Sequence, residues 1–313
     1  MDHTERKNRG NRKKWPWIVG ALAVLVLAIG GFGLKVYFDL TSTLKDMHTP
    51  LDRELSEKRE EDITFSKKDP FSVLILGVDE REGDKGRSDT MIVMAVNPTL
   101  KTTKMVSIPR DTYTDIVGYG KQDKLNHAFA FGGIEMSMDS VENLLNIPID
   151  YVVEVNMESF QTIVDTLGGV TVNNQLDFTQ DSFHYPTGEI TLNGQEALSY
   201  VRMRKEDPSG DWGRQDRQRQ VIEGVLTEGK SLTSLLHYRS VFSTLGDNVK
   251  TNMAFDEMVK IQKNYRDAAN KIEQLHFEKG EGKRMNGGIW YYIMDETELQ
   301  EVSDALKQHL NLN

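Results

Sequence analysis

The apolar stretch "FSVLILGVD", residues 71–79, is the strongest fold signal in the chain. Its apolar residues are continuous rather than alternating, which is typical of a strand buried on both faces of a sheet. Similar runs follow as "TMIVMAVNP" (90–98), "TKMVSIP" (103–109) and "YVVEVN" (151–156). These runs predict the strands of a central sheet.

Helical patterns alternate with the predicted strands. Residues 134–145 carry apolar side chains at helical spacing, and residues 157–167 end at Gly168 and Gly169, a signal for a helix C-terminus. Further helices are predicted at 214–228, 235–245, 255–268 and 296–310, and late strands at "QLHFEKG" (274–280) and "GIWYYIM" (288–294). This alternation predicts an α/β layered fold with a central parallel or mixed sheet.

The N-terminal part of the chain predicts a membrane anchor. A basic cluster precedes "WPWIVGALAVLVLAIGGFGL", residues 15–34, which carries no charge and has about the 20 apolar residues that a spanning helix needs. The basic flank places the N-terminus in the cytoplasm. A cleaved signal peptide or a buried core helix is the alternative, although no A-x-A cleavage site follows.

We therefore expect a single-pass type II protein of the cell membrane. The predicted divisions are a cytoplasmic basic head (1–14), a transmembrane signal anchor (15–38), a charged extracellular stalk (39–69) and one folded extracellular domain (70–313).

Composition excludes several classes of function. The 313 residues carry a formal net charge of -10 and include no cysteine, which rules out thiol catalysis and cysteine metal sites. Without disulfides an extracellular domain needs a core of its own, which about 240 residues allow. Basic residues beyond the N-terminus are interleaved with acidic ones, which argues against nucleic acid as a partner.

Charged residues follow the first predicted strand in "GVDEREGDKGRSDT", residues 77–90. Ligands of open α/β sheets collect at the carboxyl ends of strands, and here that end carries Asp79, Arg81, Arg87 and Asp89. The loop lacks the Walker A pattern, and Arg81 breaks the pattern of a calcium loop. It is either a ligand site or a polar surface loop.

The third strand ends in "SIPRDTY", residues 107–113. Pro109 stops the strand, so Arg110 and Asp111 are expected at the same sheet edge as Asp79. A turn with a salt-bridged arginine is the alternative. In the following "KLNHAFAFGG" (124–133), His127 is expected to be a hydrogen-bonded structural histidine rather than a ligand.

Five arginines, mixed with aspartates, lie in "YVRMRKEDPSGDWGRQDRQRQV", residues 200–221. On a helix that begins at Arg214, the apolar face that includes Val221 also carries Arg214. Arg217 lies near the edge of this face, and Arg219 is expected to point toward solvent. Arginine is rarely buried unpaired, so Arg214 is expected to face a cleft with an anionic occupant.

The preceding "YVRMR" predicts a strand that presents Arg202 and Arg204 on one face. Arginine binds phosphate through two parallel hydrogen bonds, and aspartates suit Mg²⁺ held together with substrate phosphates. The residues thus favour a site for a pyrophosphate–metal complex, with a solvated, salt-bridged helix as the alternative. A Walker A match at "GVLTEGKS" (224–231) lacks the strand that must precede it, and predicts a helix ending at Gly229.

Together, these segments resemble the LytR-CpsA-Psr family of bacterial cell-envelope transferases. The matching pieces are the basic head, the single anchor, "LILGVDEREGDKGRSDTMIV", "VSIPRDTY", "KLNHAFAFGG", "DTLGGVTV" and "ALSYVRMRKEDPSGDWGRQDRQRQV". The pieces of the folded domain cover about residues 71–221 in the family's order. The resemblance implies a three-layer α-β-α catalytic domain with a central mixed sheet, preceded by one transmembrane helix.

The implied activity is that of the wall teichoic acid transferases of Gram-positive bacteria. An anionic glycopolymer would move from undecaprenyl pyrophosphate to a peptidoglycan sugar hydroxyl, forming a phosphodiester and releasing undecaprenyl phosphate. The resemblance implies that Asp79 and Asp89 hold Mg²⁺, although oxygen ligands suit Mn²⁺ as well. Arg110 would act in catalysis, with Asp89 or Asp111 as base.

The resemblance also implies a set of arginines that bind the pyrophosphate: Arg81, Arg87, Arg110, Arg202, Arg204, Arg214 and Arg217. Two other functions fit the same residues. A pyrophosphatase would use water in place of the sugar hydroxyl, and a non-catalytic envelope sensor would need the arginines but not Asp89 or the metal.

Overall fold

The computed structural model of the chain describes residues 51, 56–79, 86–231, 249–285 and 287–312. The expected cytoplasmic head, the transmembrane anchor, most of the stalk, Arg81 and the predicted helix at 235–245 lie outside these residues. Within the described part of the chain, no helix is long and apolar enough to cross a membrane.

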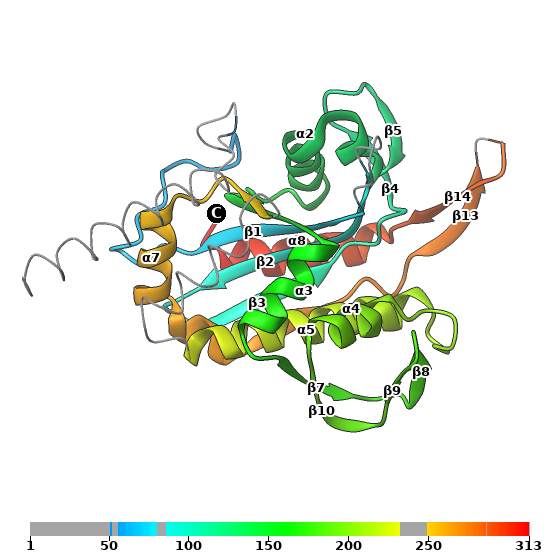
Figure 1. Ribbon diagram of the computed structural model, residues 1–313. Helices are drawn as coiled ribbons and strands as arrows, with labels where there is room; N and C mark the ends of the chain where they lie inside the picture. The colour runs from blue at the N-terminus through cyan, green and yellow to red at the C-terminus, as the bar shows by residue number, and fades with distance from the viewer. Residues whose placement is uncertain (1–50, 52–55, 80–85, 232–248, 286, 313) are drawn as a thin grey trace, which may run out of the picture.

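A six-stranded mixed sheet forms the centre of the fold (Figure 1). Its strands lie in the order β11 (Val249–Thr251), β6 (Tyr151–Asn156), β1 (Phe71–Val78), β2 (Ser88–Asn97), β3 (Thr102–Ser107) and β12 (Ile272–Leu275). β1 pairs in parallel with β6 and antiparallel with β2, and β3 pairs in parallel with β12. The predicted central mixed sheet is confirmed.

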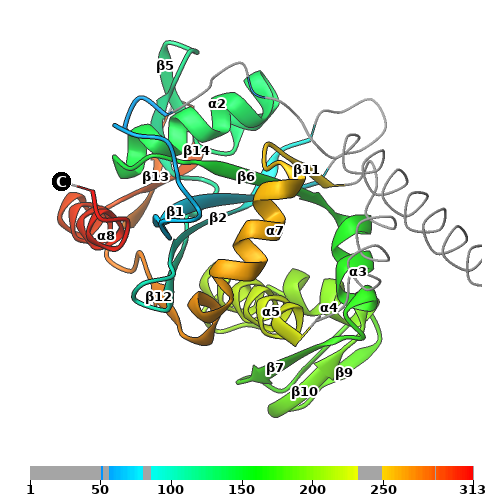
Figure 2. The same cartoon turned by 90° about the vertical axis from the view of Figure 1, so that its left-hand side faces the viewer.

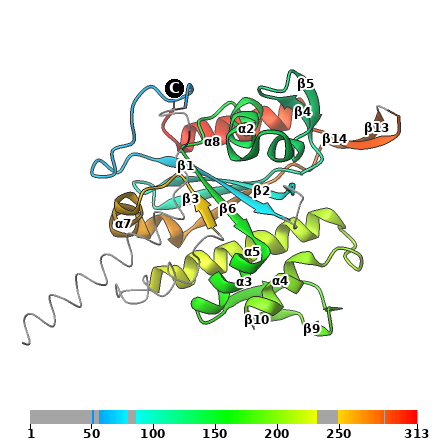
Figure 3. The ribbon, with the colours of Figure 1, turned by 45° about the horizontal axis from the view of Figure 1, so that its top comes forward.

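Helices cover both faces of this sheet (Figures 2 and 3). Leu74 and Leu76 of β1 point to the face covered by α2 (His127–Leu145) and α8 (Glu296–His309). Val73 belongs to the core on the other face, which is closed by α5 (Asp211–Ser231), α7 (Phe255–Asn264) and the 3-10 helix η2 (Arg266–Asn270). The continuous apolar run of β1 therefore reflects burial on both sides.

A smaller unit packs against the outer side of α5. It contains α3 (Met157–Thr166), α4 (Gly194–Arg202), a two-stranded antiparallel sheet of β7 (Val170–Asn174) and β10 (Gly188–Leu192), and the hairpin of β8 (Phe178–Gln180) and β9 (Phe183–Tyr185). Its core contains Phe178, Tyr185 and Tyr200.

The strand predicted for "YVRMR" is wrong, because Tyr200 and Arg202 belong to α4. Asn193 and Glu196 form a capping box at its start, which favours a helix through the next turns. Other predicted helices are present, with 134–145 inside α2, 157–167 as α3, 214–228 inside α5 and 296–310 as α8. The predicted helix at 255–268 divides into α7 and η2, and α5 continues past Gly229 to Ser231.

Two hairpins extend from the same end of the sheet (Figure 1). One joins β4 (Tyr113–Ile116) to β5 (Lys121–Lys124), and the other joins β13 (Glu281–Met285) to β14 (Ile289–Ile293). The late strand predicted at 288–294 is confirmed as β14. The strand predicted at 274–280 is present only in part, since β12 ends at Leu275.

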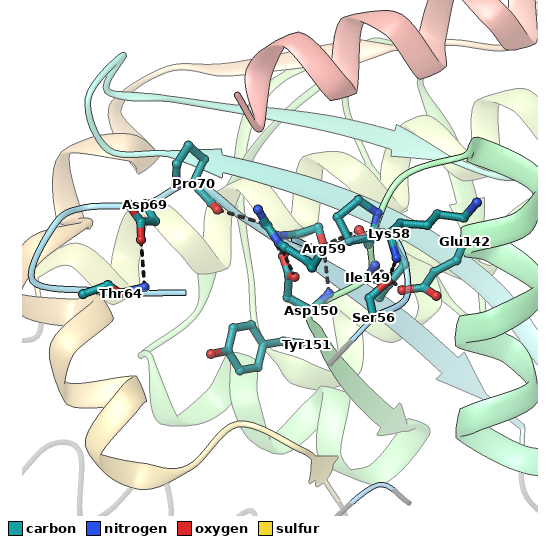
Figure 4. A network of polar contacts seen from close by, with 12 residues as sticks. Ser56, Lys58, Arg59, Thr64, Asp69, Pro70, Glu142, Ile149, Asp150 and Tyr151 are labelled. Atoms are coloured by element: carbon teal, nitrogen blue, oxygen red, sulfur yellow. Dashed lines mark hydrogen bonds and ion pairs between the residues drawn. The ribbon is translucent and has the colours of Figure 1, made fainter. Parts of the chain in front are cut away.

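Residues 56–70 pack against the folded domain (Figure 4). Arg59 donates from Nε and Nη2 to the two carboxylate oxygens of Asp150, at 2.8 and 2.7 Å. Asp150 Oδ2 also accepts from the backbone N–H of Ser72 at 2.8 Å. Phe65 is 5% exposed and stacks on Tyr151. The described end of the expected stalk is thus tied to the start of β1 and β6.

Candidate active site

A polar cavity of about 370 Å³ lies at the carboxyl end of β1. The residues that line it are Asp79, Gly86, Arg87, Asp89, Arg110, Asp111, Lys124 and Asn126. These come from the segments after β1 and β3, the start of β2, the end of β5 and the residue before α2. The predicted meeting of Asp79, Arg87, Asp89, Arg110 and Asp111 at one sheet edge is therefore what the structure shows.

A tight turn after β3 presents Arg110 and Asp111 to the cavity. The carbonyl oxygen of Pro109 accepts from the N–H of Thr112 at 3.0 Å and from its hydroxyl at 2.6 Å. The carbonyl oxygen of Arg110 accepts from the N–H of Asn126 at 3.1 Å. These bonds connect the turn to the beginning of α2.

Ion pairs connect the charged groups of the cavity. Arg110 Nη1 lies 2.8 Å from Asp89 Oδ1, and Arg110 Nε lies 3.6 Å from Asp111 Oδ2. Lys124 Nζ lies 2.6 Å from Asp111 Oδ1. Burial lowers the pKa of Arg110, but the charge and hydrogen bond of Asp89, with a contribution from Asp111, raise it above its ordinary value. Arg110 is therefore a permanent cation at the centre of the cavity.

Arg214 of α5 acts on the same group of charges. Its side chain is 13% exposed, and its Nη2 lies 2.9 Å from Asp211 Oδ1. Burial and the positive charge of Arg110 lower the pKa of Arg214, and the negative charges of Asp211 and Asp89 oppose this without reversing it. Within the described residues, its buried Nε has no hydrogen-bond partner. Arg214 is thus ion-paired within α5 close to the charges of the cavity, and its expected contact with an anionic ligand stays a prediction.

The profile of the LytR_cpsA_psr family matches residues 34–308 of the chain. The chain belongs to this family. A curated relative from Bacillus subtilis (strain 168), named polyisoprenyl-teichoic acid–peptidoglycan teichoic acid transferase TagU, is 50% identical over 307 residues, which are 97% of this chain and 99% of the relative.

Two solved structures extend the comparison of this family member. The crystal structure of B. subtilis TagU is 52% identical and has a TM-score of 0.64, over 78% of this chain and 97% of that one. The structure of the LytR-CPS2A-psr family protein YwtF (TagT) with bound octaprenyl pyrophosphate lipid is 31% identical and has a TM-score of 0.68, over 85% of this chain and 100% of that one.

Four of the predicted arginines are not among the described residues that line the cavity: Arg202, Arg204, Arg214 and Arg217. Arg202 is exposed and contacts the sulfur of Met157. Arg204 is also exposed, with Nε 3.7 Å from Asp211 Oδ1. Arg217 is 4% exposed, and its Nη1 lies 2.6 Å from Asp207 Oδ2.

The donors of Arg217 are occupied by groups of the protein. Its Nε donates to the carbonyl oxygen of Tyr200 at 3.2 Å, and its Nη2 to that of Met203 at 2.6 Å. The guanidinium also lies over the ring of Phe178, 5.4 Å from its centroid. In this structure Arg217 ties the segment after α4 to α5.

The expectation that Arg219 points toward solvent is wrong. Arg219 is 2% exposed and donates to Gln274 Oε1 of β12 at 2.9 Å, and it also pairs with Asp216. α5 is enclosed between the sheet and the smaller unit, so more than one of its faces is buried. Its apolar residues alone therefore do not mark the solvent side.

Lys124 and Asn126 were not singled out by residue type, although the quoted "KLNHAFAFGG" contains both. Asn126 is 3% exposed, and its buried Oδ1 has no hydrogen-bond partner in the described part of the chain. Its position just before a helix was the available signal. His127 Nδ1 lies 3.1 Å from Asp123 Oδ2, which agrees with the expected hydrogen-bonded structural role.

The family resemblance implies Mg²⁺, and the residues at the cavity fit such an ion. Among the described residues, no three His, Asp or Glu side chains form a group that could hold a metal by themselves. Mg²⁺, however, commonly takes one or two carboxylates and completes its shell with substrate phosphates and water. Asp79 and Asp89 would supply the carboxylates, and Asn126 Oδ1 is a buried oxygen with no hydrogen-bond partner among the described residues.

Proposed function

We propose that the chain is a polyisoprenyl-teichoic acid–peptidoglycan teichoic acid transferase. The single observation that carries this proposal is the identity of about half of all residues, over nearly the full length of both chains, with relatives of that name. The polar, arginine-rich cavity gives the assignment a physical basis, because it suits a lipid-linked pyrophosphate. The bound octaprenyl pyrophosphate in the YwtF (TagT) structure is a molecule of this chemistry.

In the proposed reaction, the glycopolymer is attached to undecaprenyl pyrophosphate. A hydroxyl oxygen of a peptidoglycan sugar attacks the phosphorus that carries the glycopolymer. The bond from this phosphorus to the bridging oxygen breaks, undecaprenyl phosphate leaves with the bridging oxygen, and a phosphodiester forms. The hydroxyl proton passes to a cavity carboxylate, Asp89 or Asp111.

Such a transfer needs positioning and charge stabilisation rather than a covalent protein nucleophile. Arg110 and Arg214 stabilise the charge that develops on the phosphoryl oxygens and on the leaving phosphate. Arg87 and Lys124 add positive charge at the cavity wall. Asp79 and Asp89 would hold Mg²⁺, which neutralises charge on the two phosphates when it is bound.

The location of the protein follows from the same proposal. A transferase for a lipid-linked donor and a wall acceptor works at the outer side of the cell membrane, and residues 15–38 would anchor it there as a type II protein. An anchor raises the effective concentration of enzyme at its lipid donor. The divisions at residues 14, 38 and 69 stay predictions.

The proposal can be tested by reconstitution of the full chain in detergent with a short polyprenyl pyrophosphate-linked teichoic acid precursor, Mg²⁺ and peptidoglycan oligomers. Mass spectrometry should detect an oligomer that carries the precursor through one phosphate, and EDTA should abolish it. Donor binding without any adduct, across several donor glycans, would contradict the proposal.

A further inference from the structure

Two exposed aromatic rings stack on each other at the turn between β4 and β5. Tyr119 lies in the turn between β4 and β5, and Phe131 lies in the first turns of α2. Their ring centroids are 4.0 Å apart with an interplanar angle of 21°. Tyr119 is 41% exposed and Phe131 is 39% exposed. We call this pair the Tyr119–Phe131 platform.

The backbone around the platform holds it in place. Gly118 and Gly120 flank Tyr119 with φ of 80° and 75°, which L side chains rarely adopt. Lys121 Nζ lies 4.7 Å from the centroid of the Tyr119 ring, a cation–π contact. Phe131 and Lys121 thus both lie over the Tyr119 ring, and the pair keeps exposed area at a surface where apolar area normally stays small unless it serves binding.

The platform is linked to the cavity through α2 and β5, which both carry cavity residues near their ends on this side of the sheet. Asn126 lines the cavity, and Phe131 follows it by five residues along α2, which is about 7.5 Å at the rise of an α-helix. The ring of His127 contacts the ring of Phe131, with centroids 5.8 Å apart. Lys124, another cavity residue, ends the strand that follows the Tyr119 turn. Figure 1 shows β4, β5 and α2 together at this end of the sheet.

We propose that the Tyr119–Phe131 platform binds a sugar ring of the peptidoglycan acceptor. This inference rests on the proposed function. Sugar rings have apolar C–H faces, which pack on the electron-rich faces of aromatic rings, and polar edges, which suit neighbours such as Lys121. A sugar on the platform would bring a neighbouring hydroxyl of the same glycan to the cavity.

The two sides of the cavity favour the acceptor over the donor. Arg214 lies on α5, which covers one face of the sheet, whereas α2 covers the opposite face (Figure 3). In phosphoryl transfer the attacking and leaving oxygens lie roughly in line. If the leaving phosphate is bound on the α5 side, the attacking hydroxyl arrives from the α2 side, where the platform lies.

The test uses the full chain in detergent, with donor at saturation and peptidoglycan oligomers varied. Phe131→Ala and Tyr119→Ala should each raise the acceptor KM about tenfold or more and leave the donor KM unchanged. Phe131→Tyr keeps a ring and should retain the wild-type acceptor KM, whereas Phe131→Leu keeps apolar volume without a ring and should not. Leu100→Ala is the matched control, because Leu100 is 58% exposed at the opposite end of the sheet.

A second measurement separates failure of this inference from failure of the proposed function. Saturation-transfer NMR with a peptidoglycan oligosaccharide measures binding even if the wild-type chain shows no transfer. Lower binding in Phe131→Ala supports the platform in either case. The inference is overturned if Phe131→Ala binds the oligosaccharide as well as the wild type does, or if it changes only the donor KM. It is also overturned if the variant keeps oligosaccharide binding and instead loses association with lipid vesicles.

Discussion

The guanidinium of Arg110 and the carboxylate of Asp89 form an ion pair across the cavity, with Nη1 and Oδ1 2.8 Å apart. The two residues belong to different elements, since Asp89 lies near the start of β2 and Arg110 follows β3. Their side chains are 25% and 37% exposed, so solvent and ligand can reach both. An arriving pyrophosphate would compete with Asp89 for Arg110, and a cation bound to Asp89 would favour that exchange.

Arg110→Ala should lower kcat for transfer by roughly 10²–10³-fold, because it removes a positioned cation from the reacting phosphate. The Arg110 side chain lines the cavity and belongs to none of the apolar core clusters, so the melting temperature should stay close to that of the wild type. Steady-state transfer rates and circular dichroism check the two expectations. A variant with full activity would remove Arg110 from the site.

Arg214→Ala should mainly lower the rate of transfer, whereas Arg219→Ala should mainly lower stability. Arg214 pairs with Asp211 and interacts with the cavity charges of Arg110 and Asp89, so its loss should lower kcat by roughly 10²-fold. Arg219 is buried against β12, so its loss should lower the free energy of unfolding by about 1–3 kcal/mol and leave kcat nearly intact. Urea unfolding and transfer assays separate the two. Equal losses of activity in folded enzyme would contradict this division.

Asp89→Asn should weaken binding of Mg²⁺ together with the polyprenyl pyrophosphate and raise the Mg²⁺ concentration that transfer needs. Asparagine keeps the shape of the side chain but removes the charge that attracts the cation. Asp115→Asn is the control, since Asp115 is exposed on β4 and lies outside the cavity wall. Calorimetric titration of the lipid-bound protein with Mg²⁺ gives a readout independent of turnover. Identical titrations for wild type and Asp89→Asn would argue against this carboxylate as a ligand.

Arg59→Ala should destabilise the domain by about 3–5 kcal/mol, because it leaves the buried carboxylate of Asp150 without its cation. Lys58→Ala is the matched control. Among the described residues its Nζ donates to the side chain of Asn146 at an exposed site, so the cost should stay below about 1 kcal/mol. Urea unfolding of the chain lacking residues 1–50 measures both. Equal stability of the two variants would show that residues 56–70 do not contribute to the folded unit.

His309 should make stability sensitive to acid. Burial lowers the pKa of His309 below its ordinary value of 6.5, and the charge of Lys104 acts in the same direction, against the hydrogen bond to the carbonyl oxygen of Thr102 and the charge of Glu273. The unfolded chain then binds a proton more readily than the folded one. Stability is therefore full above about pH 6.5 and falls as the pH drops toward the pKa of the folded state.

The check compares melting temperatures between pH 7 and pH 5. Over this range the melting temperature of the wild type should fall further than that of His309→Gln. The melting temperature of His184→Gln should fall as far as that of the wild type, because the His184 side chain is 61% exposed. If the melting temperatures of the wild type and of His309→Gln depend on pH in the same way, the prediction is contradicted.

The central sheet could be predicted because burial on both faces leaves a continuous apolar run, as in β1. The two-residue alternation from Tyr200 to Arg204 predicts a strand, but the capping box of Asn193 and Glu196 starts a helix that includes Tyr200 and Arg202. Arg219 was misplaced for another reason. A helix enclosed on several sides carries buried polar groups whose partners, such as Gln274, lie far away in sequence.

The cavity was predicted in part. Asp79 and Arg110 follow strands and Asp89 lies at the start of one, and these strand ends meet at one sheet edge by topology alone. Lys124 and Asn126 reach the same cavity through a hairpin and a helix start, whose path in space cannot be derived from local pattern. The role of Arg217 as a structural donor likewise depends on carbonyl groups that only the fold brings to it.

The stoichiometry of the two products tests the central claim most directly. With the full chain, lipid-linked donor, Mg²⁺ and peptidoglycan oligomers, transfer predicts one polyprenyl phosphate released for each oligomer that gains the glycopolymer through a phosphodiester. Both products should disappear together in Arg110→Ala. Polyprenyl phosphate released without the adduct, at every acceptor concentration, would show hydrolysis instead and would contradict the account.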